Sequence, residues 1–325
     1  MLIHYHLDAF TLVIICSIML GVSNGQLRVG FYSETCPTAE SIVQRVVQNE
    51  FSSNPQQAPR VLRLFFHDCF VEGCDGSILL GQFGVGERGA LPNLGLNGFD
   101  VINKAKEQLE AACPGVVSCA DVVSLAARDA IALTGGPNYE VPTGRRDGRI
   151  SETSLAKDIP VAEDSIELLK SKFNGKGISE EDFVLLSAGG HSIGTVACFF
   201  VQRRVYNFTE NGGSDPAIDP QLLPQLKSKC PQGGNIDARV PLDWSTETTF
   251  DDQILRNIRN GFAVLSSDAR LNDDSITKRV LDFYIASDNS SSFKADFGKA
   301  MVKMGNIGVK TGSDGEIRRV CNAIN

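Results

Sequence analysis

The feature that most constrains this chain is a set of eight cysteines that spans almost its whole length. A ninth, Cys16, lies in the apolar run 10–20, which is too short to cross a bilayer and is followed by Ser23 and Gly25 at the spacing of a signal cleavage site. We expect residues 1–25 to be a signal peptide; the alternative is an uncleaved anchor. An even number of cysteines in an exported chain predicts disulfides rather than zinc ligation, without fixing their pairing. The eight are Cys36, Cys69, Cys74, Cys113, Cys119, Cys198, Cys230 and Cys321.

The remaining residues, 26–325, have the length of one large domain or two small ones. They contain no evident linker or internal repeat, and no apolar segment approaching the roughly 18 residues of a membrane-spanning helix. The net charge of the whole chain is −8, which argues against nucleic acid or anionic membranes as partners. Sequons at Asn207 and Asn289 predict N-glycosylation, which fits export.

Apolar residues recur at helical spacing through most of the chain, so we expect a mainly α fold. The best strand candidate is the short stretch 139–143. Ser118 and Ser179 carry the capping signal of a helix start, before 122–133 and 183–186. Gly135 and Gly136 are expected to end the first of these helices. Further helices are expected near 42–51, 59–70, 101–109, 162–173, 190–206, 250–260, 274–287 and 293–304.

Beyond residue 25 the chain has only two histidines, His67 and His191. His67 follows Arg63 by four residues, so a helix places both on one face. A neutral imidazole beside a fixed cation suits proton removal by the base, while the cation stabilises charge on a departing oxygen. The alternative is an ion pair between Arg63 and Asp68 at a helix end, with His67 as a core histidine.

Oxygen-bearing groups follow His67 at close spacing and suit calcium, which prefers hard oxygen ligands. Two cysteines among them, Cys69 and Cys74, are near enough in sequence to close a small loop that tethers these groups. The side-chain oxygens belong to Asp68, Asp75 and Ser77, and carbonyl oxygens are available at Val71 and Gly73.

Residues 63–77 resemble the distal segment of the plant secretory haem peroxidases (class III), with Arg, Phe, His, Asp, both Cys, Gly, Asp and Ser at the family's spacing. The resemblance implies that Arg63 and His67 are the distal catalytic pair and that Phe66 lies over a haem b. It also implies a distal calcium site made by Asp68, Val71, Gly73, Asp75 and Ser77.

Residues 87–93 are similar to the family's Glu-x-x-Ala-x-Pro-Asn stretch. This implies that Asn93 orients His67 through its second ring nitrogen, and that Glu87 connects to the calcium shell. The next stretch, 94–99, departs from the family's pattern, because it is one residue shorter and has Asn97 where Arg is usual.

The second histidine lies in Gly189-Gly190-His191-Ser192, which alone is weak evidence and leaves a core histidine as the alternative. The segment resembles the proximal motif of the same family, with Ser192 in place of the commoner Thr, and this implies that His191 binds the haem iron. Asp268 stands where the family has the carboxylate bonded to that histidine, which strengthens it as a donor. The alternative is an exposed Asp268.

Residues 243–251 resemble the family's proximal calcium segment, although an acidic helix N-terminus is the alternative. The resemblance implies a second calcium site formed by Ser192, Asp243, Thr246, Thr249 (through its carbonyl) and Asp251. Residues 141–148 resemble the stretch at the substrate entrance, with Pro142 as the contact residue. The family's disulfides imply the pairs Cys36–Cys113, Cys69–Cys74, Cys119–Cys321 and Cys198–Cys230.

The resemblance implies one peroxidase domain over 26–325, in which two α-helical lobes sandwich a haem b beside two calcium ions. It implies a secreted, monomeric enzyme that reduces hydrogen peroxide to water and oxidises phenolic donors by one-electron steps. Two alternatives remain: a non-catalytic cell-wall protein that binds haem or glycan on this scaffold, and a calcium-stabilised protein without haem. Since only four residues follow Cys321, we expect the apoplast or cell wall.

Overall fold

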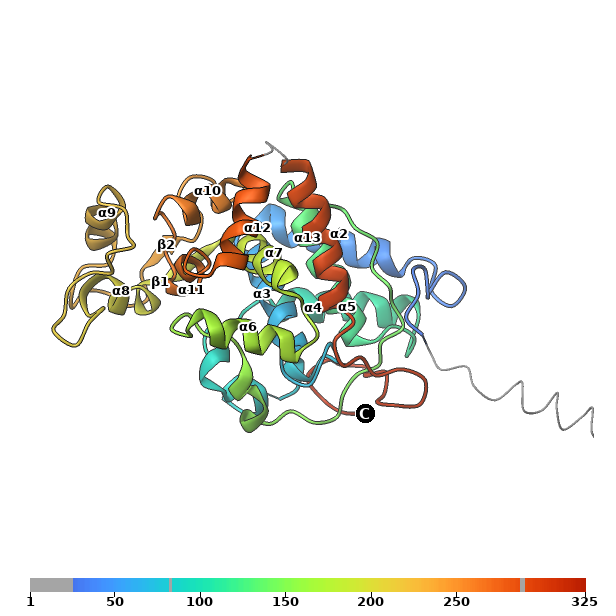
Figure 1. Cartoon of the computed structure of the whole chain (residues 1–325). Coiled ribbons are helices and arrows are strands. Elements are labelled where there is room, and N and C mark those ends of the chain that lie inside the picture. Colours follow the sequence, from blue (N-terminus) through green and yellow to red (C-terminus); the bar gives the residue numbers. More distant parts are fainter. Residues whose placement is uncertain (1–25, 82–83, 287–289) are drawn as a thin grey trace, which may run out of the picture.

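A computed structural model describes residues 26–81, 84–286 and 290–325, and these residues are mainly helical, as predicted (Figure 1). The predicted signal peptide and the sequon at Asn289 lie outside the described residues. The longer helices are α2 (Ala39–Ser53), α3 (Gln57–Cys69), α4 (Phe99–Ala112), α5 (Cys119–Leu133), α6 (Ile166–Gly175), α7 (Glu180–His191), α9 (Leu222–Lys229), α12 (Ser275–Ala286) and α13 (Ser290–Met304). The shorter elements are α8 (Gln202–Tyr206), α10 (Gln253–Arg259), α11 (Ser266–Arg270), β1 (Thr195–Ala197) and β2 (Arg239–Pro241).

Both capping signals act as the sequence predicts. The hydroxyl of Ser118 accepts the amide of Asp121 at the start of α5, and that of Ser179 accepts the amide of Asp182 at the start of α7, both at 3.1 Å. These bonds satisfy amides that have no partner inside the helix. The helix α5 ends before Gly135, whose φ of +89° is the left-handed conformation that glycine adopts without steric cost.

Two predictions of local structure are wrong. The stretch 139–143 forms no strand, and only Thr143 pairs, in an isolated antiparallel bridge with Arg28. Of the helix expected over 190–206, the residues after His191, where α7 ends, are α-helical only in α8 at 202–206. In between, the chain turns at Gly194 (φ +94°), where a Cβ would lie 2.6 Å from Pro59. It then forms β1, which pairs antiparallel with β2. This two-stranded ribbon and α9 were not predicted.

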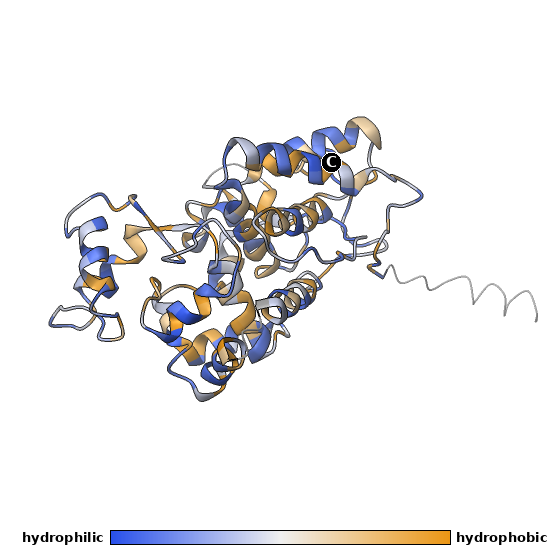
Figure 2. Ribbon diagram, turned by 90° about the horizontal axis from the view of Figure 1, so that it is seen from above, coloured by the Kyte–Doolittle hydropathy of each residue, from blue (hydrophilic) through white to orange (hydrophobic). Residues whose placement is uncertain are grey.

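The two histidine-bearing helices, α3 and α7, are packed inside the molecule. The helix α3 contacts α2, α4, α5 and α7, while α7 contacts α6, α10, α12 and α13. Their apolar residues belong to one core that continues from Tyr32 to Cys321. In Figure 2, apolar colour gathers on the helices in the interior of the molecule. The halves of the chain that carry the two histidines therefore share a single core.

A second, smaller core lies under α8, α9 and the β1–β2 ribbon, which project to one side in Figure 1. It includes the disulfide Cys198–Cys230 and Val240 of β2. This small core supports the ribbon, which forms part of the site described below.

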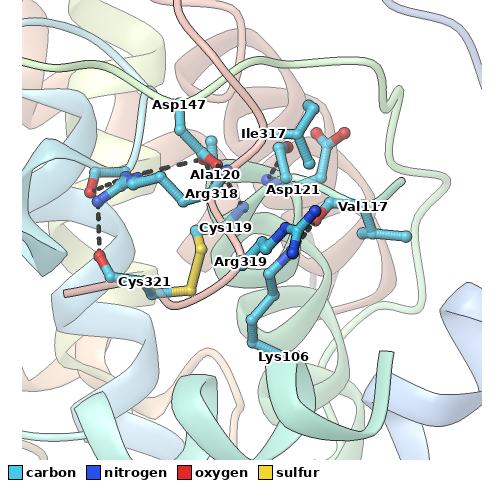
Figure 3. Close-up of a disulfide and its surroundings, with 12 residues drawn as sticks. Lys106, Val117, Cys119, Ala120, Asp121, Asp147, Ile317, Arg318, Arg319 and Cys321 are labelled. Atoms are coloured by element: carbon cyan, nitrogen blue, oxygen red, sulfur yellow. Dashed lines mark hydrogen bonds and ion pairs between the residues drawn. A yellow bond between two sulfur atoms is a disulfide. The ribbon is translucent and has the colours of Figure 1, made fainter. Parts of the chain in front are cut away.

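All four predicted disulfide pairs are confirmed: Cys36–Cys113, Cys69–Cys74, Cys119–Cys321 and Cys198–Cys230. Figure 3 shows how Cys119–Cys321 joins the C-terminal segment to the start of α5. Beside it, the buried Asp147 accepts the amides of Cys119 and Ala120, at 3.1 and 2.9 Å, and that of Arg318, at 2.9 Å. Arg318 and Cys321 are therefore part of the packed structure.

Within residues 26–81, 84–286 and 290–325, no helix combines the length and the apolar character that crossing a membrane requires.

Candidate active site

A cavity of about 670 Å³ between α3 and α7 brings the two histidines to one site. The helix α3 contributes Arg63, Phe66 and His67 to its lining, and α7 contributes Gly190 and His191. Phe66 stands edge-on to the imidazole of His67, with ring centroids 5.6 Å apart. The spacing of four residues between Arg63 and His67 does place both on the cavity side of α3, as the sequence predicts.

His67 is held in one tautomer. Its Nδ1 lies 2.6 Å from Oδ1 of Asn93, whose own Nδ2 donates to the carbonyl of Glu87 at 2.8 Å. Because that bond fixes which end of the amide faces His67, Nδ1 must carry the proton and Nε2 is left as an acceptor. Burial, and then the charge of Arg63, lower the pKa of His67 to about 3, although the bond to Asn93 acts the other way. The imidazole is therefore neutral at neutral pH.

Arg63 supplies the fixed cation beside this base. Its Nη2 donates to the carbonyl of Pro92 at 3.2 Å, while Asp68 accepts backbone amides of Gly76 and Ile78, so the alternative pairing of Arg63 with Asp68 is wrong. Burial, followed by the charge of Arg239, lowers the pKa of Arg63 to about 10, which still leaves it protonated at neutral pH.

His191, the last residue of α7, has a different kind of partner. Its Nδ1 lies 2.8 and 3.0 Å from the two carboxylate oxygens of Asp268 in α11. Asp268 is only 1% exposed, so the alternative of a surface carboxylate is wrong. Burial lowers the pKa of His191, but the charge and hydrogen bond of Asp268 outweigh this and raise it. A carboxylate at Nδ1 leaves Nε2 as the ligating nitrogen and makes it a stronger donor.

The cavity walls fit a flat, largely apolar cofactor that carries a metal. A Cβ at Gly190 would meet no atom within 4 Å, so there is empty space in the cavity next to this residue. Gly189 has another role, because a Cβ there would clash with the ring of Phe297, which packs against α7. With an imidazole on each side, the lining fits a haem. Apolar side chains around the histidines include Phe66, Phe173, Phe200, Leu265 and Met301.

The predicted distal calcium residues converge after the end of α3. Oδ2 of Asp68 accepts the amide of Gly76, and Oδ1 of Asp75 accepts the amide of Ser77, both at 3.0 Å. Glu87 is fully buried, and neither its carboxylate oxygens nor the hydroxyl of Ser77 has a hydrogen-bond partner among the described residues. Burial, and then the charge of Asp68, raise the pKa of Glu87 to about 9. Buried oxygens that lack donors fit a bound cation.

Two predicted carbonyl ligands and one carboxylate of this set also have protein partners. The carbonyl of Val71 accepts Nζ of Lys176 at 2.7 Å, and that of Gly73 accepts the amide of Asp75 at 2.8 Å. Nζ of Lys310 lies 2.8 Å from Oδ2 of Asp75. A carbonyl oxygen has two lone pairs, so these bonds leave room for a metal.

The predicted proximal calcium residues gather next to His191. The hydroxyl of Ser192 donates to the carbonyl of Asp251 and accepts its amide, both at 3.0 Å. Thr246 donates its hydroxyl to Oδ1 of Asp251 at 3.1 Å and accepts the amide of Thr249 at 2.8 Å. Oδ1 of Asp243 accepts Nδ2 of Asn257, whereas its Oδ2 is buried and has no hydrogen-bond partner among the described residues. Burial raises the pKa of Asp243 to about 6. This donor set also fits calcium.

Across the described part of the chain, no three carboxylate, thiol or imidazole groups cluster as metal ligands. Both candidate calcium sites therefore depend on hydroxyl and backbone oxygens in addition to carboxylates, which calcium accepts.

The prediction that Pro142 contacts substrate is wrong, because Pro142 does not line the cavity. Its carbonyl instead accepts Nη1 of Arg145 at 2.8 Å, and Arg145 forms a buried ion pair with Asp121 at 2.8 Å. The segment is held in place by these interior bonds. Pro160, with Val161 and Ala162 in the loop before α6, does line the cavity, as do Pro59 and Pro92.

Sequence reasoning missed Pro160 and two arginines, Arg60 and Arg239, which also line the cavity. Arg60 could have been found, since it lies one turn before Arg63 on α3. Arg239 had no such signal, because the strand that places it is only three residues long.

Comparisons with known proteins agree with this geometry. The family model described as peroxidase matches residues 43–287. The chain is 56% identical to Peroxidase 43 of Arabidopsis thaliana over 312 residues, which cover 95% of each chain. It is 57% identical to Peroxidase 13 of the same plant over 94% of this chain and 95% of that protein. To Peroxidase N1 of Nicotiana tabacum it is 49% identical, over 97% and 96% of the two chains.

Proposed function

This chain belongs to the plant secretory haem peroxidase family (class III) and is a peroxidase, and we propose that it uses a haem b held between His67 and His191. We propose hydrogen peroxide as the oxidant and small phenols as the donors, each oxidised by one electron. The observation that carries this proposal is one cavity with two imidazoles, one bonded to the neutral amide of Asn93 and the other to the carboxylate of Asp268.

The haem would be held by Nε2 of His191, with Asp268 behind it and Phe66 against the macrocycle. When bound, the haem supplies an iron centre that takes up the oxidising equivalents of the peroxide and accepts one electron from each donor molecule. The side chains that face this centre transfer the proton and stabilise the developing charge.

Across the cavity from His191, Nε2 of His67 would accept a proton from one peroxide oxygen and deliver it to the other, which would leave as water as the O–O bond breaks. The bond between Asn93 and Nδ1 keeps Nε2 free for this task. The guanidinium of Arg63 stabilises the negative charge that develops on the departing oxygen. The carbonyl of Pro92 holds Arg63 in position for it.

We propose two bound calcium ions as supports of this arrangement. The distal ion would be bound by Asp68 and Asp75 together with hydroxyl and carbonyl oxygens of the same segment. Glu87 would connect to this shell, and its carbonyl accepts Nδ2 of Asn93. The proximal ion would be bound beside His191, through Ser192. Each site therefore fixes a segment that carries or orients one of the two histidines.

We further propose that residues 1–25 are removed, that 26–325 form the secreted, monomeric enzyme of the apoplast or cell wall, and that Asn207 and Asn289 carry glycans. Asn207 is exposed, which glycosylation requires. No observation favours the non-catalytic alternative, since the base, the cation and the metal-ligating histidine share one cavity.

The test is to refold the chain with haem and calcium, record the Soret band and measure oxidation of guaiacol. Replacing His67→Leu removes the base, so the peroxide reaction should slow roughly 10²- to 10⁴-fold with the Soret band retained. Asn93→Val keeps the base but removes the bond that orients it, so the peroxide reaction should slow roughly 10- to 100-fold. Full-speed peroxide reaction in His67→Leu would refute the proposed role, and a wild-type chain without a Soret band would refute the haem site.

A further inference from the structure

The cavity carries more positive charge than the proposed reaction uses. Three arginines line it, Arg60, Arg63 and Arg239, against one carboxylate, Asp268, which is already bonded to His191. The chain as a whole has a net charge of −8, so this local excess of cations runs against the composition. Charges of one sign inside a concave site concentrate oppositely charged ligands there.

Arg60 lies on α3, one turn before Arg63, and is half-buried at the cavity. Among the described residues its guanidinium has no hydrogen bond or ion pair. Its donors therefore remain available to a ligand. An arginine that is held against a cavity wall without an anion is the kind of group that binds a planar anion through two parallel bonds.

Arg239 comes from β2, on the ribbon supported by the small second core. Its Nε donates to the hydroxyl of Thr195 at 3.1 Å, and its Nη2 to the carbonyl of Thr195 at 2.6 Å. These bonds fix the plane of the guanidinium and leave Nη1 without a partner among the described residues. Arg239 is therefore oriented by β1 and still has a free donor.

The three guanidinium groups are near one another. Partial burial, and then the charge of Arg60, lower the pKa of Arg239, and Arg239 in turn contributes to lowering the pKa of Arg63. Such like-charge proximity is unfavourable unless an anion lies between the groups.

We propose that Arg60 and Arg239 form a carboxylate-binding subsite at the mouth of the cavity. The subsite rests on the proposed function, because the carboxylate belongs to a molecule that this function brings to the cavity. It is either a propionate of the haem or the carboxylate of a phenolic acid donor. Both are planar anions that match the guanidinium fork. Removing the arginines should speed haem release if the anion is a propionate, and should weaken binding of the acid donor if the anion belongs to the donor.

The first arm of the experiment uses the haem-loaded enzyme and measures haem release to excess apomyoglobin from the change in the Soret band. The variants are Arg60→Gln, Arg239→Gln and the double variant. Arg319→Gln, which removes an exposed arginine outside the cavity, is the control. If the subsite binds a propionate, the double variant should release haem roughly 10-fold faster or more, and the control should match wild type.

The second arm measures the dissociation constants of 4-hydroxycinnamic acid and of its methyl ester, by spectral titration of the same haem-loaded proteins. If the subsite binds the donor, wild type should prefer the acid, and the double variant should lose roughly 10-fold of that preference with the ester unaffected. Circular dichroism checks that each variant is folded.

Either loss supports the subsite and identifies its source. A double variant that is folded and haem-loaded, with haem release and acid preference both equal to wild type, overturns the subsite and leaves the proposed function intact. A wild-type chain that takes up no haem overturns the proposed function instead.

Discussion

Replacing Asp268→Asn isolates the effect of the charge behind His191. Asparagine has the shape of aspartate and can still accept the proton of Nδ1, so the substitution changes a charge-assisted hydrogen bond into a neutral one. The bond is short, at 2.8 Å, and Asp268 is 1% exposed, so solvent weakens this interaction little. The side chain touches the reaction only through the histidine.

The size of the effect follows from the two kinds of hydrogen bond. A bond to a charged group contributes about 1.5–3 kcal/mol and a neutral one about 0.5–1.5, so the change amounts to about 1–1.5 kcal/mol. For a one-electron couple, 1.4 kcal/mol corresponds to about 59 mV. Because the carboxylate favours the more oxidised metal, we expect the ferric–ferrous potential to rise by about 40–65 mV in Asp268→Asn.

The assay is a spectroelectrochemical titration of wild type, Asp268→Asn and Asp273→Asn, all loaded with haem. Asp273 is a matched control, since it lies close in sequence but pairs with Arg270 at the surface, and its potential should equal that of wild type. A haem-loaded Asp268→Asn enzyme with an unchanged or more negative potential would refute the reasoning that the carboxylate strengthens His191 as a donor.

Two further predictions concern stability. Removing Cys119–Cys321, which closes 202 residues, should lower the free energy of unfolding by up to about 5 kcal/mol, against up to about 4 for Cys198–Cys230, which closes 32. Urea unfolding of the paired Cys→Ser variants measures both, and the reverse order would contradict the loop-entropy argument. Stripping calcium with a chelator should lower the melting temperature by at least about 5 °C, restored by calcium but not by magnesium. An unchanged melting temperature would count against both calcium sites.

Local sequence patterns predicted the helices well where a chemical signal marks the boundary. The hydroxyls of Ser118 and Ser179 cap α5 and α7 as expected, because capping involves atoms only a few residues apart. The pattern failed after His191, where no local signal distinguishes a short ribbon strand from more helix. A strand of three residues is too short to show alternation and depends on its partner β2.

The catalytic pair was predictable for the same reason as the caps. Arg63 and His67 face the cavity together because four residues make about one helical turn. The contact between His191 and Asp268 joins residues 77 apart, so it was available only through the family resemblance. Pro142 was misplaced because the sequence of a loop does not show whether the loop lines a cavity or, as here, carries a buried ion pair.

The sequence by itself determined the chemistry that is available: eight cysteines for four disulfides, one arginine–histidine face and two segments rich in oxygen ligands. Only the tertiary structure decided which groups meet. It turned the chain at Gly194, placed Arg239 on a ribbon beside Arg60, and put Pro160 rather than Pro142 at the cavity. The physical reason is range, since helices and caps depend on neighbours within a turn, whereas a cavity wall is assembled by packing between segments that are distant in sequence.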